Sequence, residues 1–270
     1  SCITRSIMVP RWYRSSVTKA LLAGVATVSA ALSLHAAPPQ IEGGNRTYEN
    51  CMNLAHKDPD GALEAALAWQ DMNGGGAARH CGAVALFNLG QYEQAAKRFK
   101  AVADAMGDAP SEARAAMLAQ AGAAWFRAEQ LEKAYAIQSA ALKLAPNDSE
   151  ILIDRATTLG AARNYWEAID DLNRVIEADP ERTDALILRA SAYRFVDALP
   201  LAQQDVDAAY RLAPGRPGGL LEYGILKRLA GDLEGARQIW LELIRLHDGT
   251  PAAAAAQRNL ELLDVKLDRK

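Results

Sequence analysis

The sequence is poor in the residues from which reactive and metal-binding sites are usually built. Its 270 residues include three cysteines and four histidines, and aromatic residues make up only 6% of the chain. Lys and Arg number 30 against 33 Asp and Glu, so the formal net charge is −3. A nucleic-acid-binding protein is expected to be basic, and this balance of charge therefore excludes that class.

Apolar and small residues, in contrast, are abundant. Half of the residues are hydrophobic, 23% are charged and about a fifth are alanine, which is well above ordinary alanine usage. The chain is long enough to bury a full core, and its composition excludes a disordered or collagen-like protein. This composition predicts tightly packed helices.

The first 36 residues predict an export signal. Three basic residues, Arg11, Arg14 and Lys19, lie between Met8 and the apolar stretch 20–34, and small residues follow it. Basic, apolar and small regions in this order are typical of a secretory signal peptide, here with cleavage after Ala36. Residues 1–7 precede the first methionine and are interpreted as an extension from an early start codon. The short apolar stretch favours removal over a permanent anchor; an uncleaved anchor and a buried helix are the alternatives.

Export predicts a location in the periplasm or cell envelope, with membrane association only if the signal stays uncleaved. Removal of residues 1–36 takes away four basic residues and no acidic residue, which lowers the net charge from −3 to −7. No other stretch of the sequence approaches membrane-spanning length. Disulfides persist in such a compartment, and Cys51 and Cys81 remain after processing.

The body of the sequence repeats itself with a period of 34 residues. Small residues recur in two columns, apolar residues in a third and prolines in a fourth. The columns are Gly122, Ala156, Ala190 and Gly224; Ala134, Ala168, Ala202 and Ala236; Leu131, Tyr165, Leu199 and Leu233; and Pro146, Pro180 and Pro214. Within each period, apolar residues lie three and four positions apart on both sides of a polar break, which predicts two amphipathic helices and a tight turn. Small residues let the two helices approach closely, and the prolines end the second helix.

Residues 118–148 and 152–180 resemble tetratricopeptide repeats, and the chain is similar to exported bacterial-type members of that family. The resemblance implies an all-α, right-handed α-solenoid of antiparallel helix pairs with a C-terminal capping helix. Five extra residues near 109–113 separate the first two repeats. The expected segments are a linker at 37–46, a degenerate leading helix pair at 47–76, repeats at 77–109, 115–148, 149–182, 183–216 and 217–250, and the capping helix at 251–270. We also expect turns at 58–61 and 74–76, and Pro200 in the first turn of its helix.

The resemblance also bears on the two remaining cysteines. It assigns Cys51 to the first helix of the leading pair and Cys81 to the first helix of the next pair, and such helices are neighbours in these stacks. This predicts a disulfide, which would stabilise the N-terminal region by roughly 3 to 4 kcal/mol in the chain-entropy model. The alternative is that both residues are small buried thiols.

The sequence contains no motif for catalysis, for a metal or for a cofactor. It lacks HExxH, CxxC, GxSxG and P-loop patterns. His80 and Cys81 are adjacent and would point about 100° apart on a helix, and Cys51 and His56 are also poorly spaced for metal chelation. We therefore expect a protein that is not an enzyme and that has no metal, cofactor or small-molecule substrate.

Two charged columns share the 34-residue period and allow two interpretations. Arg155 and Arg189 lie on predicted first helices, and Asp171 and Asp205 lie on predicted second helices. One interpretation is a ladder that binds an acidic ligand. The other is that each arginine joins neighbouring helices through a local carboxylate.

The predicted function is protein–protein interaction, as a scaffold or adaptor that binds a partner segment in a concave groove. The family's groove positions correspond here to His80, Val84, Phe87, Gln120, Phe126, Ile153, Asp154, Ile187, Ser191, Arg194, Leu221, Ile225 and Arg228. Their apolar members predict an apolar or mixed peptide segment, not a free C-terminal carboxylate, with Arg194 and Arg228 adding salt-sensitive steering. The alternatives are a structural subunit of an envelope complex, a solute- or glycan-binding module, or apolar residues that only pack within the superhelix.

Overall fold

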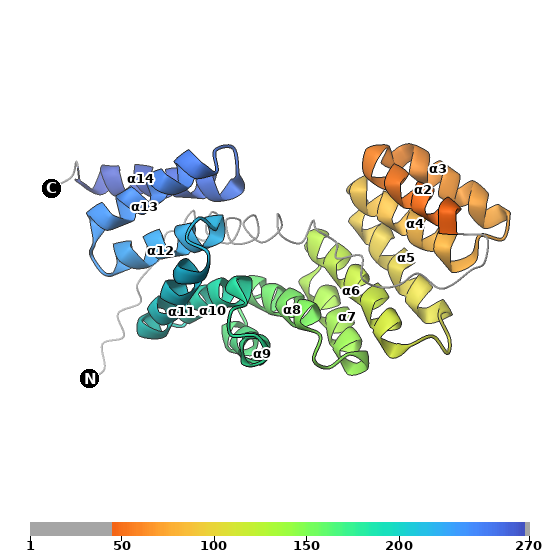
Figure 1. The fold of residues 1–270 in the computed structure, drawn as a ribbon, viewed down its shortest axis with the longest axis horizontal. Coiled ribbons are helices and arrows are strands. Elements are labelled where there is room, and N and C mark those ends of the chain that lie inside the picture. The colour runs from red at the N-terminus through yellow and green to blue at the C-terminus, as the bar shows by residue number, and fades with distance from the viewer. Residues whose placement is uncertain (1–44, 268–270) are drawn as a thin grey trace, which may run out of the picture. The chain divides into compact units, whose positions relative to one another are not determined.

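The computed structural model describes residues 45–267, with side chains described over 47–264. The predicted signal peptide and all but the end of the predicted linker lie outside the described residues. Within 45–267 there are thirteen helices and no strand. Figure 1 shows how these helices follow one another along the chain. The helices are α2 (Asn45–Lys57), α3 (Pro59–Asp71), α4 (Gly75–Asn88), α5 (Tyr92–Ala105), α6 (Ser111–Arg127), α7 (Leu131–Leu144), α8 (Ser149–Ala161), α9 (Tyr165–Ala178), α10 (Thr183–Phe195), α11 (Leu199–Leu212), α12 (Pro217–Leu229), α13 (Leu233–Leu246) and α14 (Pro251–Leu267).

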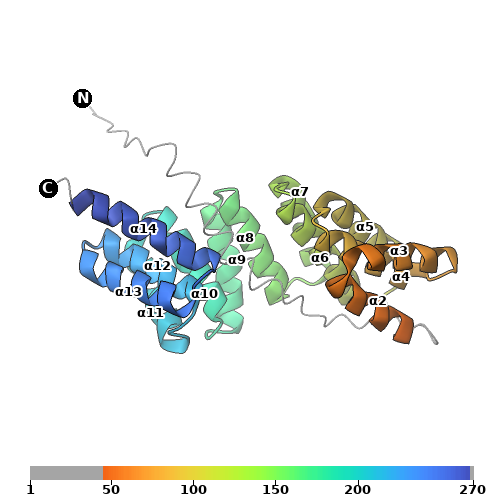
Figure 2. The ribbon, with the colours of Figure 1, turned by 90° about the horizontal axis from the view of Figure 1, so that it is seen from above.

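The described chain divides into two units, residues 45–167 and residues 168–267, and the boundary falls inside α9. In each unit the two helices of a pair pack against each other, for example α4 with α5 and α12 with α13. Successive first helices also pack, since α2 contacts α4 and α10 contacts α12. Figure 2 shows the paired helices of each unit side by side. Each unit is thus an all-α repeat solenoid, which confirms the predicted fold class.

Four helix starts at the N-terminal end differ from the expected segments, the first being α2, which begins at Asn45 inside the predicted linker. Helix α6 begins at Ser111, so most of the inserted residues extend this helix by a turn instead of forming a loop. Helices α3 and α4 begin at Pro59 and Gly75, inside the segments predicted as turns. For α3 the reason is local: Asp58 accepts a hydrogen bond from the backbone N–H of Gly61 at 3.1 Å and caps the helix.

The turn between the two helices of a pair is built in the same way in five pairs. Each contains one residue with positive φ at the same position of the repeat. Its φ is 76° at Gly90, 59° at Glu129, 67° at Arg163, 60° at Asp197 and 86° at Gly231. This left-handed conformation favours glycine, and three pairs adopt it with other residues. The period of the sequence is therefore a period of backbone conformation as well as of packing.

Where the two helices of a pair cross, a residue of the first helix faces the residue 16 positions later on the second helix. The first residue is smallest where the second is large. A Cβ atom built on Gly224 would lie 2.2 Å from Nε1 of Trp240, and one built on Gly122 would lie 2.7 Å from Cγ of Gln138. At the equivalent crossing in α10 and α11, an alanine packs in one cluster with a valine, Val206. Glycine thus occurs where the partner side chain occupies the space of a methyl group.

Cys51 and Cys81 form a disulfide that joins α2 to α4, with their Cα atoms 6.1 Å apart. Both side chains belong to the buried core of the first unit. The bridge links two first helices whose sequence separation is 30 residues.

Reduction of this disulfide is expected to lower the free energy of unfolding of the first unit by about 3 kcal/mol, because the unfolded chain regains the entropy of an open loop. Urea titrations of the protein with and without a reductant measure the difference. The double variant Cys51→Ala/Cys81→Ala is the control and should not respond to the reductant. Equal stability of the oxidised and reduced wild-type protein would contradict the prediction.

Candidate functional site

The candidate interaction surface is the side of each unit that is formed by the first helices of the pairs. These are α2, α4, α6 and α8 in the first unit and α10 and α12 in the second, and we call the two surfaces the first-helix faces. All thirteen residues predicted to line a groove lie on α4, α6, α8, α10 or α12. Their side chains differ in whether they reach the surface.

Eight of the thirteen residues are partly exposed, and the other five are buried. The partly exposed residues are Phe87, Gln120, Phe126, Asp154, Ile187, Arg194, Ile225 and Arg228. The buried residues, none more than 8% exposed, are His80, Val84, Ile153, Ser191 and Leu221. The side chains of these five lie inside the folded protein, so a partner does not reach them in this conformation and their role as ligand contacts stays a prediction.

The apolar column Ile153, Ile187 and Leu221 mainly stabilises helix packing. Two of its members are buried, and the side chain of Ile187 lies over the start of α12. A Cβ atom built on Gly219 would lie 3.4 Å from Cδ1 of Ile187, and one built on Gly218 would lie 3.6 Å from its Cγ2. The alternative that these residues pack within the superhelix is therefore the better account of this column.

Arg194 forms an ion pair with Glu222 of the neighbouring first helix. The two side chains are only 9% and 5% exposed. Arg194 donates from Nε to one carboxylate oxygen and from Nη2 to the other at 3.3 Å, and also from Nη2 to the hydroxyl of Ser191 at 3.2 Å. This corrects the predicted steering role of Arg194, because its charge is already bound by Glu222. The sequence pattern did not indicate Glu222, which lies outside the family's groove positions.

His80 joins three successive first helices of the first unit. Its Nε2 lies 2.9 Å from Oε1 of Gln120 on α6, and its Nδ1 lies 2.7 Å from the hydroxyl oxygen of Tyr48 on α2. An amide oxygen only accepts hydrogen bonds, so Nε2 carries the proton and Nδ1 accepts from Tyr48. Burial lowers the pKa of His80 from its ordinary value of 6.5 and raises the pKa of Tyr48 to about 12.

Asp154, on α8, is an acid in an environment that disfavours its charge. Burial, followed by repulsion from Glu150 and Asp148 at the start of the same helix, raises the pKa of its carboxyl group from 3.8 to about 7. Near neutral pH the charge of this predicted groove residue is therefore only partly present.

The raised pKa of Asp154 makes stability depend on pH. Between pH 4 and pH 7 the folded state retains a proton that the unfolded state releases, so the contribution is complete below pH 4 and is lost as the pH rises through 7. The full shift corresponds to at most about 4 kcal/mol, and we expect about half of it because the side chain is partly exposed. Asp154→Asn should therefore be more stable than the wild type at pH 8 and equal to it near pH 4. Urea titrations across this range test the prediction, and a gain independent of pH would contradict it.

An aromatic–arginine cluster, consisting of Phe87, Tyr92 and Arg127, lies at the C-terminal ends of α4 and α6 and at the first residue of the second helix α5. The rings of Phe87 and Tyr92 meet edge to face, with centroids 5.2 Å apart. The exposed guanidinium of Arg127 lies over both rings, 4.8 Å from the centroid of Tyr92 and 5.8 Å from that of Phe87. Arg127 also donates a hydrogen bond from Nη2 to the Tyr92 hydroxyl at 2.7 Å.

The sequence prediction included Phe87 but missed the other two members of this cluster. Tyr92 precedes Leu131 of the apolar column by 39 residues, which is the 34-residue period plus the five inserted residues, and Arg127 directly follows the predicted Phe126. The hydrogen bond to Tyr92 uses one of the five N–H donors of the guanidinium. The cluster therefore combines partly exposed aromatic surface with a positive charge whose orientation is held by the rings.

Structural comparison relates this chain to several solved helical repeat proteins. A tetratricopeptide repeat protein from Parabacteroides merdae superposes with a TM-score of 0.56 at 20% identity, covering 83% of this chain and 76% of that one. MamA from Desulfovibrio magneticus gives 0.54 at 20% identity, over 68% of this chain and 97% of that one. YrrB, described as a TPR protein with an unusual peptide-binding site, gives 0.51 at 17% identity, over 71% and 96%. The chain has the tetratricopeptide repeat fold.

A scan against protein-family models finds no match, and no curated protein matches the chain. The tetratricopeptide assignment therefore describes how the chain folds. The helix pairs, the turns and the crossing residues described above are the features that this fold requires.

In the tetratricopeptide fold of this chain, the arginine column consists of Arg155 and Arg189. The described contacts of both arginines join neighbouring helices. Arg189 of α10 donates two hydrogen bonds to Asp205 of α11, at 2.8 and 2.7 Å, and a third to Asn173 of α9 at 2.8 Å. Arg155 donates to the hydroxyl of Ser139 at 3.2 Å, 16 positions earlier as Asn173 is for Arg189. The interpretation of the column as local links between helices is confirmed at Arg189, because Asp205 already binds the charge that an acidic ligand would need.

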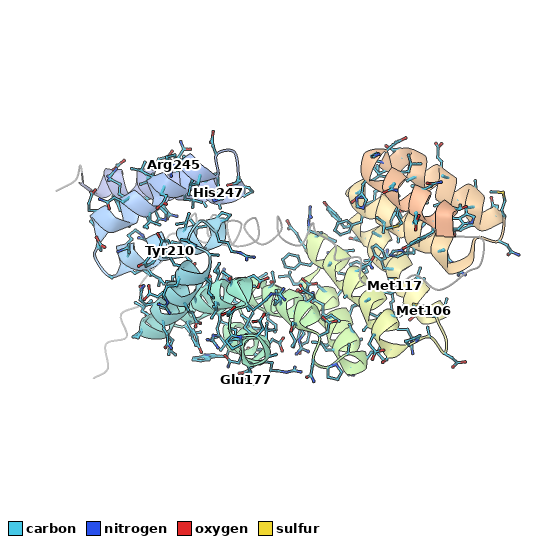
Figure 3. The ribbon with its side chains drawn as sticks, in the orientation of Figure 1. Met106, Met117, Glu177, Tyr210, Arg245 and His247 are labelled. Carbon is cyan, nitrogen blue, oxygen red and sulfur yellow. A yellow bond between two sulfur atoms is a disulfide. The ribbon has the colours of Figure 1, made fainter. Side chains whose placement is uncertain are left out.

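Residues 47–264 contain no group of three or more His, Cys, Asp or Glu side chains that is arranged to hold a metal ion. His247, labelled in Figure 3, donates a hydrogen bond from Nε2 to the carbonyl oxygen of Gly215 at 2.6 Å. Among the helices that the structure describes, none is long and apolar enough to cross a membrane.

Proposed function

We propose that this protein is an interaction scaffold that holds a segment of a partner protein on its first-helix faces, in the periplasm or cell envelope. Tetratricopeptide solenoids expose one long face built from first helices, and such a face suits an extended or helical segment. The similar fold of YrrB, whose description names a peptide-binding site, supports a segment of protein as the ligand.

The observation that carries the proposal is the aromatic–arginine cluster. Aromatic and arginine side chains are the residues that contribute most to protein interfaces, and here Arg127 lies on two partly exposed rings. The proposed segment has an apolar side chain that packs on Phe87 and a neighbouring Asp or Glu side chain that pairs with Arg127. Partly exposed Phe126 and Gln120, on the same helix as Arg127, extend the contact.

The proposed location rests on two independent features. The first is the order of basic, apolar and small regions in residues 8–37, which is typical of an exported chain. The second is the disulfide between Cys51 and Cys81, because structural disulfides persist in oxidising compartments.

Site-specific photocrosslinking in cells tests the function. A photoreactive amino acid at Phe126 should give a discrete crosslinked product in the envelope fraction, whereas the same amino acid at exposed Glu132, on the second helix α7, should not. Mass spectrometry of the product identifies the partner. Arg127→Ala should then weaken binding of the purified partner at least tenfold, about 1.4 kcal/mol, and by less at high salt. The same crosslinks from both positions, or from neither, would contradict the proposal.

A further inference from the structure

Three first helices of the first unit are joined at one buried side chain. His80 of α4 uses both ring nitrogens, with Nδ1 bonded to Tyr48 of α2 and Nε2 bonded to Gln120 of α6. Its side chain is 6% exposed. The neutral imidazole satisfies both partners, because one of its nitrogens accepts and the other donates.

We propose that His80 is an acid-sensitive lock, which holds α2 against α4 and α6 at neutral pH and releases α2 when the imidazole is protonated. Protonation places an N–H on Nδ1, so Tyr48 can no longer donate its hydrogen bond there and must turn its hydroxyl hydrogen to another acceptor. It also places a positive charge in the core, which is unfavourable without a nearby carboxylate.

The described contacts of His80 come from Tyr48, Phe99 and Gln120, and none of the three carries a charge that compensates the imidazolium. From α2 the ring of Tyr48 stacks on the imidazole, with centroids 5.9 Å apart, and from α5 the ring of Phe99 lies 5.7 Å away. From α6 the contact is the neutral amide of Gln120. None of these described contacts of His80 is charged, and burial accordingly lowers the pKa of His80 below 6.5.

The direction of the effect follows from this pKa. Above pH 6.5 His80 is neutral in the folded and the unfolded protein, and the lock contributes fully. As the pH falls below 6.5, the unfolded or opened state binds a proton that the closed state does not, so the closed state loses stability. The disulfide between Cys51 and Cys81 keeps the middle of α2 tethered to α4, which confines the release to the N-terminal end of α2, where Tyr48 lies.

The lock adjoins the first-helix face of the first unit. The lock itself does not depend on the proposed function, and only an effect of the release of α2 on partner binding rests on it. Its test therefore uses the isolated protein without a partner. Hydrogen exchange of the backbone amides of α2, corrected for the intrinsic pH dependence of exchange, is compared at pH 7.5 and pH 5.5. We expect protection of α2 to fall several-fold at the lower pH, with about tenfold as the upper limit for one histidine with an opened-state pKa of 6.5, while protection of α13 in the second unit stays within twofold.

Two variants and one spectroscopic measurement complete the test. His80→Gln is neutral at both pH values and should abolish the pH dependence, whereas His56→Gln, on the exposed surface of α2, should retain it. If His80→Gln does not fold, Tyr48→Phe serves instead and should show reduced protection of α2 already at pH 7.5.

An NMR titration should place the pKa of His80 below 6.5. Constant protection of α2 between the two pH values, or a pKa of His80 at or above 6.5, would overturn the proposal. Neither result would bear on crosslinking at Phe126, so the lock and the proposed function can fail separately.

Discussion

Replacement of Gly224 by alanine is expected to destabilise the second unit by about 3 kcal/mol, although alanine is the better helix former. The new methyl group would lie 2.2 Å from Nε1 and 2.6 Å from Cδ1 of Trp240. Trp240 is fully buried and lies in the core cluster with Leu220 and Leu243, so its ring cannot move aside without disrupting that cluster. Urea or thermal unfolding of the purified variant measures the loss.

A matched control separates this clash from the general effect of replacing glycine in a helix. Gly160 lies in α8 with no atom within 4 Å of an added Cβ, and Gly160→Ala should raise stability by about 0.5 to 1 kcal/mol. Trp240→Ala should lower stability by about 3 to 5 kcal/mol by leaving a cavity. The double variant Gly224→Ala/Trp240→Val copies the alanine and valine at the equivalent crossing of α10 and α11. It should recover part of the stability that Trp240→Ala loses. A neutral effect of Gly224→Ala would show that the crossing is more loosely packed than described.

Removal of one partner of the pair between Arg194 and Glu222 is expected to cost about 3 to 5 kcal/mol. Glu222→Leu leaves the guanidinium of Arg194 inside the protein without its carboxylate, and Arg194→Met leaves the carboxylate of Glu222 without its cation. Both side chains are nearly buried, so water does not replace the missing partner. Unfolding free energies of the two single variants measure the cost.

The double variant Arg194→Met/Glu222→Leu is the informative control. It removes both charges together and fills the site with apolar groups, which is often neutral or stabilising. We expect its stability to lie within about 1 kcal/mol of the wild type, which gives a coupling energy of several kcal/mol in the mutant cycle. Single variants that cost less than about 1 kcal/mol would indicate a solvated pair, and the predicted steering by Arg194 would then be open again.

Leu221 was predicted to line the groove, and its burial makes it a core residue. Replacing a true groove residue by aspartate would be expected to prevent partner binding without affecting the fold. Because Leu221 is buried in the same cluster as Trp240, its replacement by aspartate affects folding and gives no information on binding. Variants of Phe87, Phe126 and Arg127 are the appropriate test of the surface.

The sequence by itself determined the repeat and therefore the fold. Columns such as Gly122, Ala156, Ala190 and Gly224 recur every 34 residues because each helix pair must turn and cross in the same way. The described helices form successive pairs for this reason, and the starts of α2, α3, α4 and α6 are the ones that depart from the expected segments. Cap and turn residues act within a few positions along the chain, so their effects can be read from local sequence.

The tertiary structure decided which first-helix residues reach the surface and which charges are paired. A first helix packs on its own second helix and also on the neighbouring first helices, so helical periodicity does not distinguish a buried position from an exposed one. Leu221 is buried and Ile225 is partly exposed on the same helix, and Arg194 meets Glu222 across 28 residues. Such contacts depend on the distance and tilt between helices, which result from the summed sizes of all residues at their crossings.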